Sequence, residues 1–487
     1  MDCISTRGRA SSVGSAMALV NGLAPDGGLY VPAVFPAALP PAVWTGLGYA
    51  ATTELVLGRF LDDIPSAARS QAALAIPQRF GRLDPVPLVN AGGVFFLELF
   101  HGPTRAFKDV ALSALPPLLS SAAAGRRLAI VTATSGDTGP ATMAGFAGME
   151  NVQVLVFYPA QGISEIQRRQ MVCQTAANVK AVAVDGNFDD AQAAVKAAFA
   201  DAALGKELAA AGISLTSANS INMGRLVPQM AYWLHAYGAL VAQGTIRCGD
   251  PVDIVVPTGN FGNLLAAWWA RRLGLPIRRL VCAANENDVL VEFLRTGVYD
   301  RRRQFRVTNS PSMDILVSSN LERLLYEMAA GDPGLVAGWM GQLQKDGYYN
   351  VGGAVLARLQ ERFAAGSASM PATESATAAL WREHGYLADP HTAVAWDVWR
   401  RQAANDGVPV LVAATASPWK FPATMCRSLG IPCAGDEFAA MAGLAAVTGQ
   451  DDPVLARLAK APVVHRQICQ RHEAPEMLRQ SFLDMKK

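Results

Sequence analysis

The chain has 487 residues, 51% of them hydrophobic and 17% charged, and its 42 Lys and Arg residues nearly balance its 40 Asp and Glu residues. So many apolar residues can build more than one hydrophobic core, which excludes a wholly disordered chain. The net charge of +2, without a long basic run, leaves no electrostatic footprint for nucleic acid or for an anionic membrane, so we expect neither as a partner.

The cysteines and the first residues bear on the compartment. Seven cysteines, none of them in a CxxC pair, argue against a disulfide framework and a structural zinc site, so we expect reduced thiols and no metal. Residues 1–14 do not read as a signal peptide, and the most apolar stretch, residues 226–241, is too short to cross hydrocarbon of about 30 Å. We expect a cytoplasmic protein.

The pattern of predicted elements indicates an α/β protein. Residues 1–90 are rich in Gly, Pro and turn signals and are predicted to form an N-terminal subdomain. From there on, β-rich runs alternate with Ala-rich segments of helical periodicity, as in βαβ units. The predicted strands are residues 94–100, 128–133, 152–159, 179–185, 213–216, 252–258, 279–284 and 408–415, and the predicted helices include residues 164–175, 189–203, 220–237 and 264–273. Residues 365–378 are predicted to be a surface loop or linker, and the tail after Asp451 to be helical and to pack on the surface.

A lysine, Lys108, stands where the strand at residues 94–100 gives way to a helix. A lone lysine in such a place is usually a solvated surface charge, but this one stands among apolar residues such as Phe107 and Val110. Apolar surroundings destabilise the ammonium form, which is the condition for a Schiff base with an aldehyde cofactor.

Three polar loops follow later strands and have the composition of anion sites. Residues 132–139 (TATSGDTG) and 257–264 (PTGNFGNL) each open a helix, whose N-terminal N–H groups and dipole favour an anion. Residues 217–225 (SANSINMGR) add Arg225 on the first turns of a helix, which could form a second anion site. Helix capping, with Arg225 on the surface, remains an alternative. The first loop is not a P-loop, and the glycine spacing of the second does not match a dinucleotide-binding fingerprint, so a nicotinamide enzyme is disfavoured.

The last polar segment, residues 415–421, ends another apolar run. The hydroxyl of Thr415 would point out of the carboxyl edge of the sheet, where open α/β sheets bind ligands. Together the five segments suggest a lysine, a phosphate cradle and a second anion site on one face of a parallel sheet.

In this order, the motifs resemble those of threonine synthase, a family of pyridoxal phosphate enzymes of fold type II. The resemblance covers nearly the whole chain and includes residues 5–8, 22–31 and 310–323. It implies fold class α/β with parallel or mixed sheets flanked by helices, an N-terminal subdomain at residues 1–90, and a catalytic region at residues 91–487 whose two lobes enclose the site. It also implies a pyridoxal phosphate-dependent lyase that makes L-threonine and phosphate from O-phospho-L-homoserine and water, the last step of threonine biosynthesis, by γ-elimination and β-addition of water. The protein would be a monomer or a homodimer.

The resemblance also implies roles for single residues. Lys108 would form the Schiff base with the cofactor, and the other cofactor contacts would come from Asp137 near the 3′ oxygen, Thr415 at the pyridine nitrogen, and a phosphate loop of Gly259, Asn260, Phe261, Gly262 and Asn263. The substrate would be bound at its carboxylate by Thr134 and Ser135 and at its phosphate by Thr138, Asn219, Ser220 and Arg225. Three residues depart from the family pattern: Arg105 stands for an apolar residue, Ser417 for a histidine and Trp419 for a small residue.

Two other readings stay open. A lyase of the same fold, either a threonine synthase-like phospho-lyase that does not hydrate Cβ or a threonine/serine dehydratase, would use the same lysine. A noncatalytic ligand-binding or regulatory protein could have kept the fold, but the presence of Lys108 counts against it.

Overall fold

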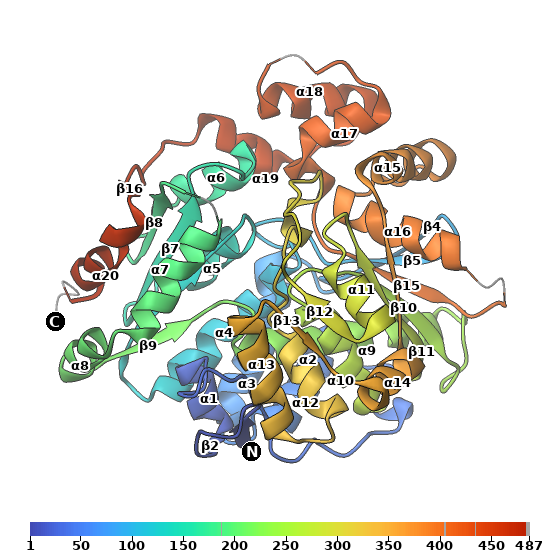
Figure 1. Ribbon diagram of the computed structural model, residues 1–487. Helices are drawn as coiled ribbons and strands as arrows, with labels where there is room; N and C mark the ends of the chain where they lie inside the picture. The colour runs from blue at the N-terminus through green and yellow to red at the C-terminus, as the bar shows by residue number, and fades with distance from the viewer. Residues whose placement is uncertain (187, 404–405, 434, 484–487) are drawn as a thin grey trace.

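Two sheets of mainly parallel strands organise the molecule (Figure 1). The computed structural model describes residues 1–186, 188–403, 406–433 and 435–483. The five-stranded sheet, on the left of Figure 1, is wholly parallel and has the order β16-β8-β7-β6-β9. Its strands are β6 (Arg127–Ala133), β7 (Val152–Pro159), β8 (Val179–Val184), β9 (Ile213–Ser217) and β16 (Ile468–Cys469).

The six-stranded sheet, on the right of Figure 1, has the order β14-β11-β10-β15-β5-β4. Only its edge strand β4 runs antiparallel, so the sheet is mixed. Its strands are β4 (Leu88–Ala91), β5 (Val94–Glu98), β10 (Val252–Pro257), β11 (Ile277–Ala284), β14 (Phe363–Ser367) and β15 (Val410–Ala414). All eight strands predicted from apolar runs are confirmed to within about two residues, because parallel strands buried on both faces leave uninterrupted runs of apolar residues.

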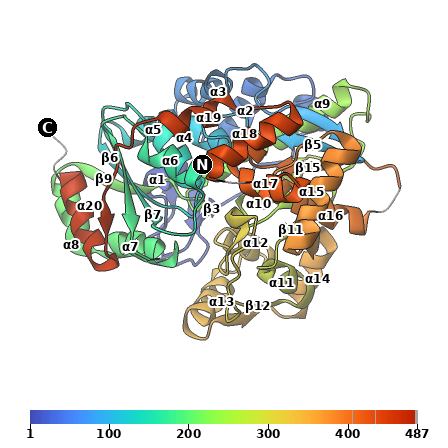
Figure 2. The ribbon, with the colours of Figure 1, turned by 90° about the horizontal axis from the view of Figure 1, so that it is seen from above.

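Helices cover both sheets, and each sheet has its own outer core. Against the five-stranded sheet pack α7 (Phe188–Ala200), α8 (Ala202–Ala210) and α20 (Ala474–Leu483), and against the six-stranded sheet pack α15 (Met370–His384) and α16 (Pro390–Gln402) (Figure 2). A third, larger core lies between the sheets and includes α4 (Lys108–Ala123), α9 (Met223–Ala242) and α10 (Gly262–Arg272). The other α-helices described after residue 91 are α5 (Thr138–Phe146), α6 (Glu165–Val172), α11 (Val289–Thr296), α12 (Leu321–Met328), α13 (Pro333–Lys345), α14 (Gly353–Arg362), α17 (Pro422–Leu429), α18 (Glu437–Thr448) and α19 (Pro453–Ala456).

The N-terminal segment forms a small antiparallel sheet and three helices. The sheet has the order β2-β1-β3, from β1 (Asp2–Ser5), β2 (Val13–Gly14) and β3 (Tyr30–Pro32), and the helices are α1 (Ser15–Asn21), α2 (Tyr49–Phe60) and α3 (Ser66–Phe80). Glu322 of α12 ties this segment to the rest of the chain, since it accepts hydrogen bonds from Thr6 Oγ1 at 2.6 Å and from the Arg7 guanidinium at 2.9 Å. A second antiparallel pair, β12 (Val298–Asp300) and β13 (Tyr348–Asn350), lies near α13.

One sequence prediction is wrong and another is incomplete. The predicted linker at residues 365–378 contains the end of β14 and the first half of α15, which begins after the N-cap Ser369 and buries Ala376 and Thr377. Ala368, Thr373 and Ala378 of this stretch are buried as well, so half of its Ser, Ala and Thr residues pack in the interior although Ser369 and Ser375 are exposed. The tail after Asp451 is not only helical, since β16 joins the edge of the five-stranded sheet through a parallel pairing of Ile468 and Cys469 with β8.

Candidate active site

Lys108 is the first residue of α4, and the segment before it is held against the end of β15. Ala106 forms an isolated antiparallel bridge with Ala416, and the Phe107 N–H donates to the Thr415 carbonyl at 2.8 Å. The Lys108 side chain is only 14% exposed, and its Nζ lies 3.6 Å from Oδ2 of Asp137. The strand-to-helix position predicted for this lysine is confirmed, and its amine points to a buried carboxylate.

Asp137, which directly precedes α5, is the centre of a hydrogen-bonded cluster. Its Oδ1 accepts from Lys420 Nζ at 2.7 Å and from Gln167 Nε2 at 2.9 Å, and its Oδ2 accepts from Ser312 Oγ at 2.9 Å. With Lys108, four side chains from different parts of the chain therefore converge on one carboxylate that is 3% exposed.

Burial and charge set the protonation of this cluster. Burial, together with the positive charges of Arg225 and Lys420, lowers the pKa of Lys108 to about 8, against the attraction of Asp137. Burial alone would raise the pKa of Asp137, but Lys420 and Lys108 hold it well below its usual range. At neutral pH the carboxylate is ionised, and the Lys108 amine loses its proton within a few pH units of neutrality.

Three members of this cluster were not predicted as site residues: Lys420, Gln167 and Ser312. Ser312 is itself positioned, because its N–H donates to His391 Nε2 at 3.1 Å while His391 Nδ1 lies 2.6 Å from Asp389 Oδ1. Only Lys420 carried a sequence signal. Like Lys108, it follows an apolar strand and has an aromatic neighbour. No local sequence pattern predicts the contacts of Gln167 and Ser312 with Asp137.

The glycine loop lies at the N-terminus of α10, as predicted. Phe261 has a left-handed backbone, with φ of 62°, and is buried. The Gly259 carbonyl accepts from Ser318 Oγ at 2.8 Å, and the Asn260 carbonyl accepts from Asn320 Nδ2 at 3.1 Å. With these carbonyls engaged on the protein side, the loop and the first turn of α10 offer N–H groups to an anion.

The predicted substrate residues lie on two other loops. Thr134, Ser135 and Thr138 lie between β6 and the start of α5, where Thr134 Oγ1 accepts from the Gly136 N–H at 3.0 Å. Asn219 and Ser220 follow β9, and Asn219 joins the two loops by donating from Nδ2 to the Ala133 carbonyl at 2.9 Å. The structure thus brings both groups to the carboxyl ends of adjacent strands, β6 and β9.

Arg225, on the first turn of α9, is buried rather than on the surface. One of its terminal nitrogens donates to the Ala218 carbonyl at 2.6 Å, and its Nε has no hydrogen-bond partner among the described residues. Burial lowers the pKa of Arg225 to about 10, against the attraction of buried Asp109, so the guanidinium stays charged at neutral pH. The alternative of a solvated surface arginine is therefore wrong.

The segment after β15 contains the remaining predicted residue, Thr415, and two of the three positions that depart from the family pattern, Ser417 and Trp419; the third, Arg105, lies just before α4. Thr415 is 7% exposed at the end of the strand. Trp419 packs in an apolar core with Leu387 and Met425, while Arg105, with φ of 61°, lies 2.8 Å from Asp452. Through these contacts, Trp419 and Arg105 join the segments next to the site to the C-terminal part of the chain.

The residues present fit a phosphorylated aldehyde cofactor. Lys108 supplies a buried amine of lowered pKa, and the glycine loop supplies N–H donors. Asn263, at 6% exposure, buries both its Nδ2 and its Oδ1 without a hydrogen-bond partner in the described part of the chain. Polar groups are rarely left so in a folded protein, and a bound polar ligand would satisfy them.

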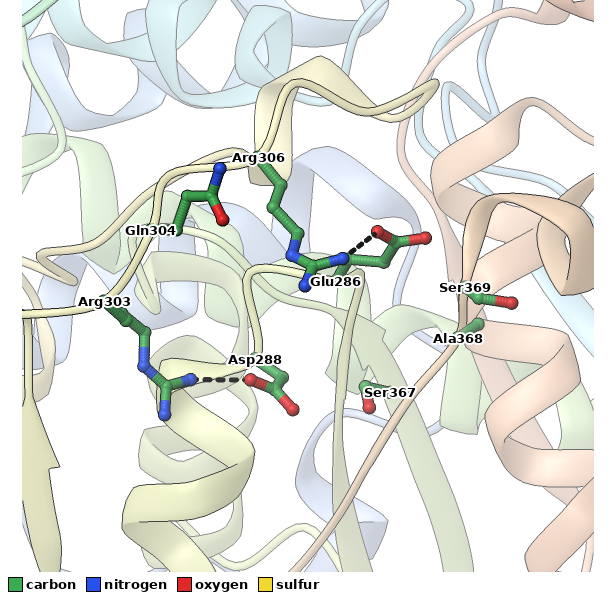
Figure 3. Close-up of a pocket in the computed structure, with 8 residues that line it drawn as sticks. All are labelled: Glu286, Asp288, Arg303, Gln304, Arg306, Ser367, Ala368 and Ser369. Carbon is green, nitrogen blue, oxygen red and sulfur yellow. Dashed lines mark hydrogen bonds and ion pairs between the residues drawn. The ribbon is translucent and has the colours of Figure 1, made fainter.

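A pocket of about 520 Å³ lies elsewhere, beyond the carboxyl ends of β11 and β14 (Figure 3). Its two arginines are already paired, Arg303 with Asp288 at 2.6 Å and Arg306 with Glu286 at 3.1 Å. No predicted site residue lines this pocket. Among the described residues there is no His, Cys, Asp and Glu cluster suited to a metal ion, and none of the helices described there is long and apolar enough to span a bilayer.

The chain is similar to known proteins in both sequence and structure. Residues 82–337 match the pyridoxal-phosphate dependent enzyme family, and residues 2–72 match the threonine synthase N terminus family. Threonine synthase of Pseudomonas aeruginosa is 37% identical over 434 residues, which cover 87% of this chain and 89% of that protein.

Two further similarities extend the comparison. Human threonine synthase-like 1 is 39% identical over 429 residues, covering 85% of this chain, but the chain spans only 58% of that longer protein. The crystal structure of a PLP-bound threonine synthase from Brucella melitensis superposes with a TM-score of 0.86 at 35% identity and covers 99% of both chains. The predicted family and fold are confirmed.

Proposed function

The chain belongs to the threonine synthase family of pyridoxal phosphate-dependent enzymes, and from this premise we propose that it converts O-phospho-L-homoserine and water to L-threonine and phosphate. The family match and the PLP-bound relative confirm pyridoxal phosphate as the predicted cofactor. We further propose that residues 1–90 form the N-terminal subdomain and residues 91–487 the catalytic region, with a cytoplasmic location and a monomeric or homodimeric state.

Arg225 is the observation that most directly supports a phosphorylated substrate. Arg225 is 2% exposed, its charge lowers the pKa of the Lys108 amine, and its Nε lacks a partner among the described residues. A buried cation with an unused donor is costly unless an anion binds it. A substrate phosphate, oriented by Thr138, Asn219 and Ser220 on the neighbouring loops, fits that need.

The other predicted residues would bind the cofactor, orient the substrate and move protons. When bound, pyridoxal phosphate supplies an electron sink for negative charge that develops on the substrate. The loop from Gly259 to Asn263 would hold its phosphate, Thr415 would face its pyridine nitrogen and Asp137 its 3′ oxygen. Thr134 and Ser135 would orient the substrate carboxylate. Lys108 would hold the cofactor and would move protons at the substrate's α-carbon and near its γ-carbon.

Product analysis with O-phospho-L-homoserine tests this function against the same-fold alternatives. We expect equal amounts of threonine and phosphate. Phosphate with a 2-oxo acid and ammonia in place of threonine would indicate a phospho-lyase that does not hydrate Cβ, an outcome to consider given the similarity to threonine synthase-like 1. Activity on threonine or serine without phosphate release would indicate a dehydratase.

Lys108→Ala tests the proposed role of the lysine. Turnover should fall by roughly 10⁴-fold, the upper end of the range for a positioned acid–base group, and the visible band of the lysine-bound cofactor should disappear. Lys345→Ala, at an exposed position in the last turn of α13, is the matched control and should change neither. Borohydride reduction followed by peptide mapping should place the cofactor on Lys108, and its recovery on Lys420 would contradict the proposal.

A further inference from the structure

A second lysine occupies the site, and its contacts differ from those of Lys108. Lys420 ends the short 3-10 helix at Pro418–Lys420 and is 0% exposed. Its Nζ donates to the Thr104 carbonyl at 2.8 Å and lies 2.7 Å from Asp137 Oδ1. The Lys108 amine is 3.6 Å from the other oxygen of the same carboxylate and keeps 14% exposure.

The backbone fixes the relative position of the two lysines. Their strands, β5 and β15, are hydrogen-bonded neighbours in the six-stranded sheet. Beyond the strand ends, Phe107 N–H donates to the Thr415 carbonyl at 2.8 Å and Ser417 N–H donates to the Arg105 carbonyl at 3.0 Å. The two segments are thus joined immediately before each lysine, and both side chains reach Asp137.

A buried carboxylate needs a counterion, and one carboxylate can fully match only one cation. The charged groups that act on the Lys108 amine are Asp137, Arg225 and Lys420, of which only Asp137 favours its protonated form. Because Lys420 is nearer to Asp137 and fully buried, it takes the counterion role. Lys108 is then left with the longer contact to Asp137, at 3.6 Å, which does less to keep its proton.

We propose that Lys420 is a positioning residue that neutralises Asp137 and thereby leaves Lys108 available as a free amine. The inference rests on the proposed role of Lys108 in holding the cofactor. It assigns the two lysines different roles: Lys420 stays fixed against Asp137, whereas Lys108 gives up its proton and reacts. Without Lys420, Asp137 would recruit Lys108 as its counterion.

The test measures the reactivity of Lys108 itself. The full-length chain, freed of cofactor, is labelled with trinitrobenzenesulfonate over a range of pH, and labelling at Lys108 is quantified by peptide mapping. In the wild-type protein the rate should rise through a midpoint near pH 8. In Lys420→Met the loss of a repelling cation and the release of Asp137 both favour protonated Lys108. The midpoint should therefore rise by about one pH unit, a tenfold lower rate at neutral pH.

A second substitution separates charge from packing. In the double variant Asp137→Asn/Lys420→Met neither the carboxylate nor its counterion remains, so the midpoint should return to the wild-type value or fall below it. This variant also carries the test if Lys420→Met alone does not fold. The matched control Lys345→Met should leave the midpoint unchanged.

Three outcomes would overturn the inference. An unchanged midpoint in Lys420→Met with only a lower melting temperature would make Lys420 purely structural. A midpoint that stays raised in the double variant would show that Asp137 is not the intermediary. Recovery of the cofactor on Lys420 after borohydride reduction of the wild-type holoenzyme would reject the role of Lys108 as well, and so identifies a failure of the proposed function.

Discussion

The two loops proposed to bind anions, residues 257–263 at the end of the six-stranded sheet and residues 217–225 at the end of the five-stranded sheet, are held in place by different kinds of contact. The first is shaped by its backbone, with carbonyls of Gly259 and Asn260 held by Ser318 and Asn320. The second is shaped by side chains, since Asn219 bonds the neighbouring loop and Arg225 the Ala218 carbonyl. The first should therefore be sensitive to an added Cβ, and the second to a changed polar group.

Of the variants that test this comparison, Gly259→Val should have the largest effect. A Cβ atom at this position would lie 2.8 Å from the Ser312 carbonyl oxygen, closer than real Cβ contacts allow. Ser312 also holds Asp137, so a displaced Ser312 would disturb both the phosphate loop and the lysine cluster. Gly259→Val should weaken cofactor binding by about 3 kcal/mol, the upper end of the range for overpacking, or roughly 100-fold. Equilibrium dialysis of the cofactor measures this, and unchanged retention would refute the steric argument.

Arg225→Lys is expected to have the next largest effect and to act on the substrate only. Both side chains are cationic, but a guanidinium can bind two phosphate oxygens at once, whereas an ammonium is a point charge. One lost charge-assisted hydrogen bond, about 1.5–3 kcal/mol, should lower kcat/KM by about 10- to 100-fold. The cofactor band should be untouched. A variant that keeps full activity on phosphohomoserine, or that loses its cofactor instead, would show that Arg225 does not serve the substrate phosphate.

The sequence predicts the local features of the fold and the site, but it does not predict contacts between distant segments. Buried parallel strands and the loops after them are local features, so the eight strands and the position of Lys108 follow from runs of residues. Contacts between distant segments have no such signature: Ser312 and Asp137 are 175 positions apart, and only folding joins them. Lys420 has the same local pattern as Lys108, and its 2.7 Å contact with Asp137 is what distinguishes the two. The edge strand β16, with two residues, is too short to give a periodic pattern.

The smallest effect is expected at Gly262, the second glycine of the same loop. This position can be compared directly with Gly259, because a Cβ has room at one of them and not at the other. Gly262 is the first residue of α10 and lacks a positive φ, and a Cβ there would meet Asn320 Nδ2 at 3.6 Å and Gln229 Nε2 at 4.0 Å, both ordinary contacts. Gly262→Ala should therefore keep the backbone N–H in place, leave cofactor affinity within about twofold, and raise the free energy of unfolding by about 0.4–1 kcal/mol by restricting the unfolded chain. Dialysis and urea unfolding measure the two quantities. Because the loop is held by its backbone and by the contact at Gly259, an added Cβ should lower cofactor affinity at Gly259 but not at Gly262. A large loss of cofactor in Gly262→Ala would mean instead that the bound phosphate itself needs the space at Gly262.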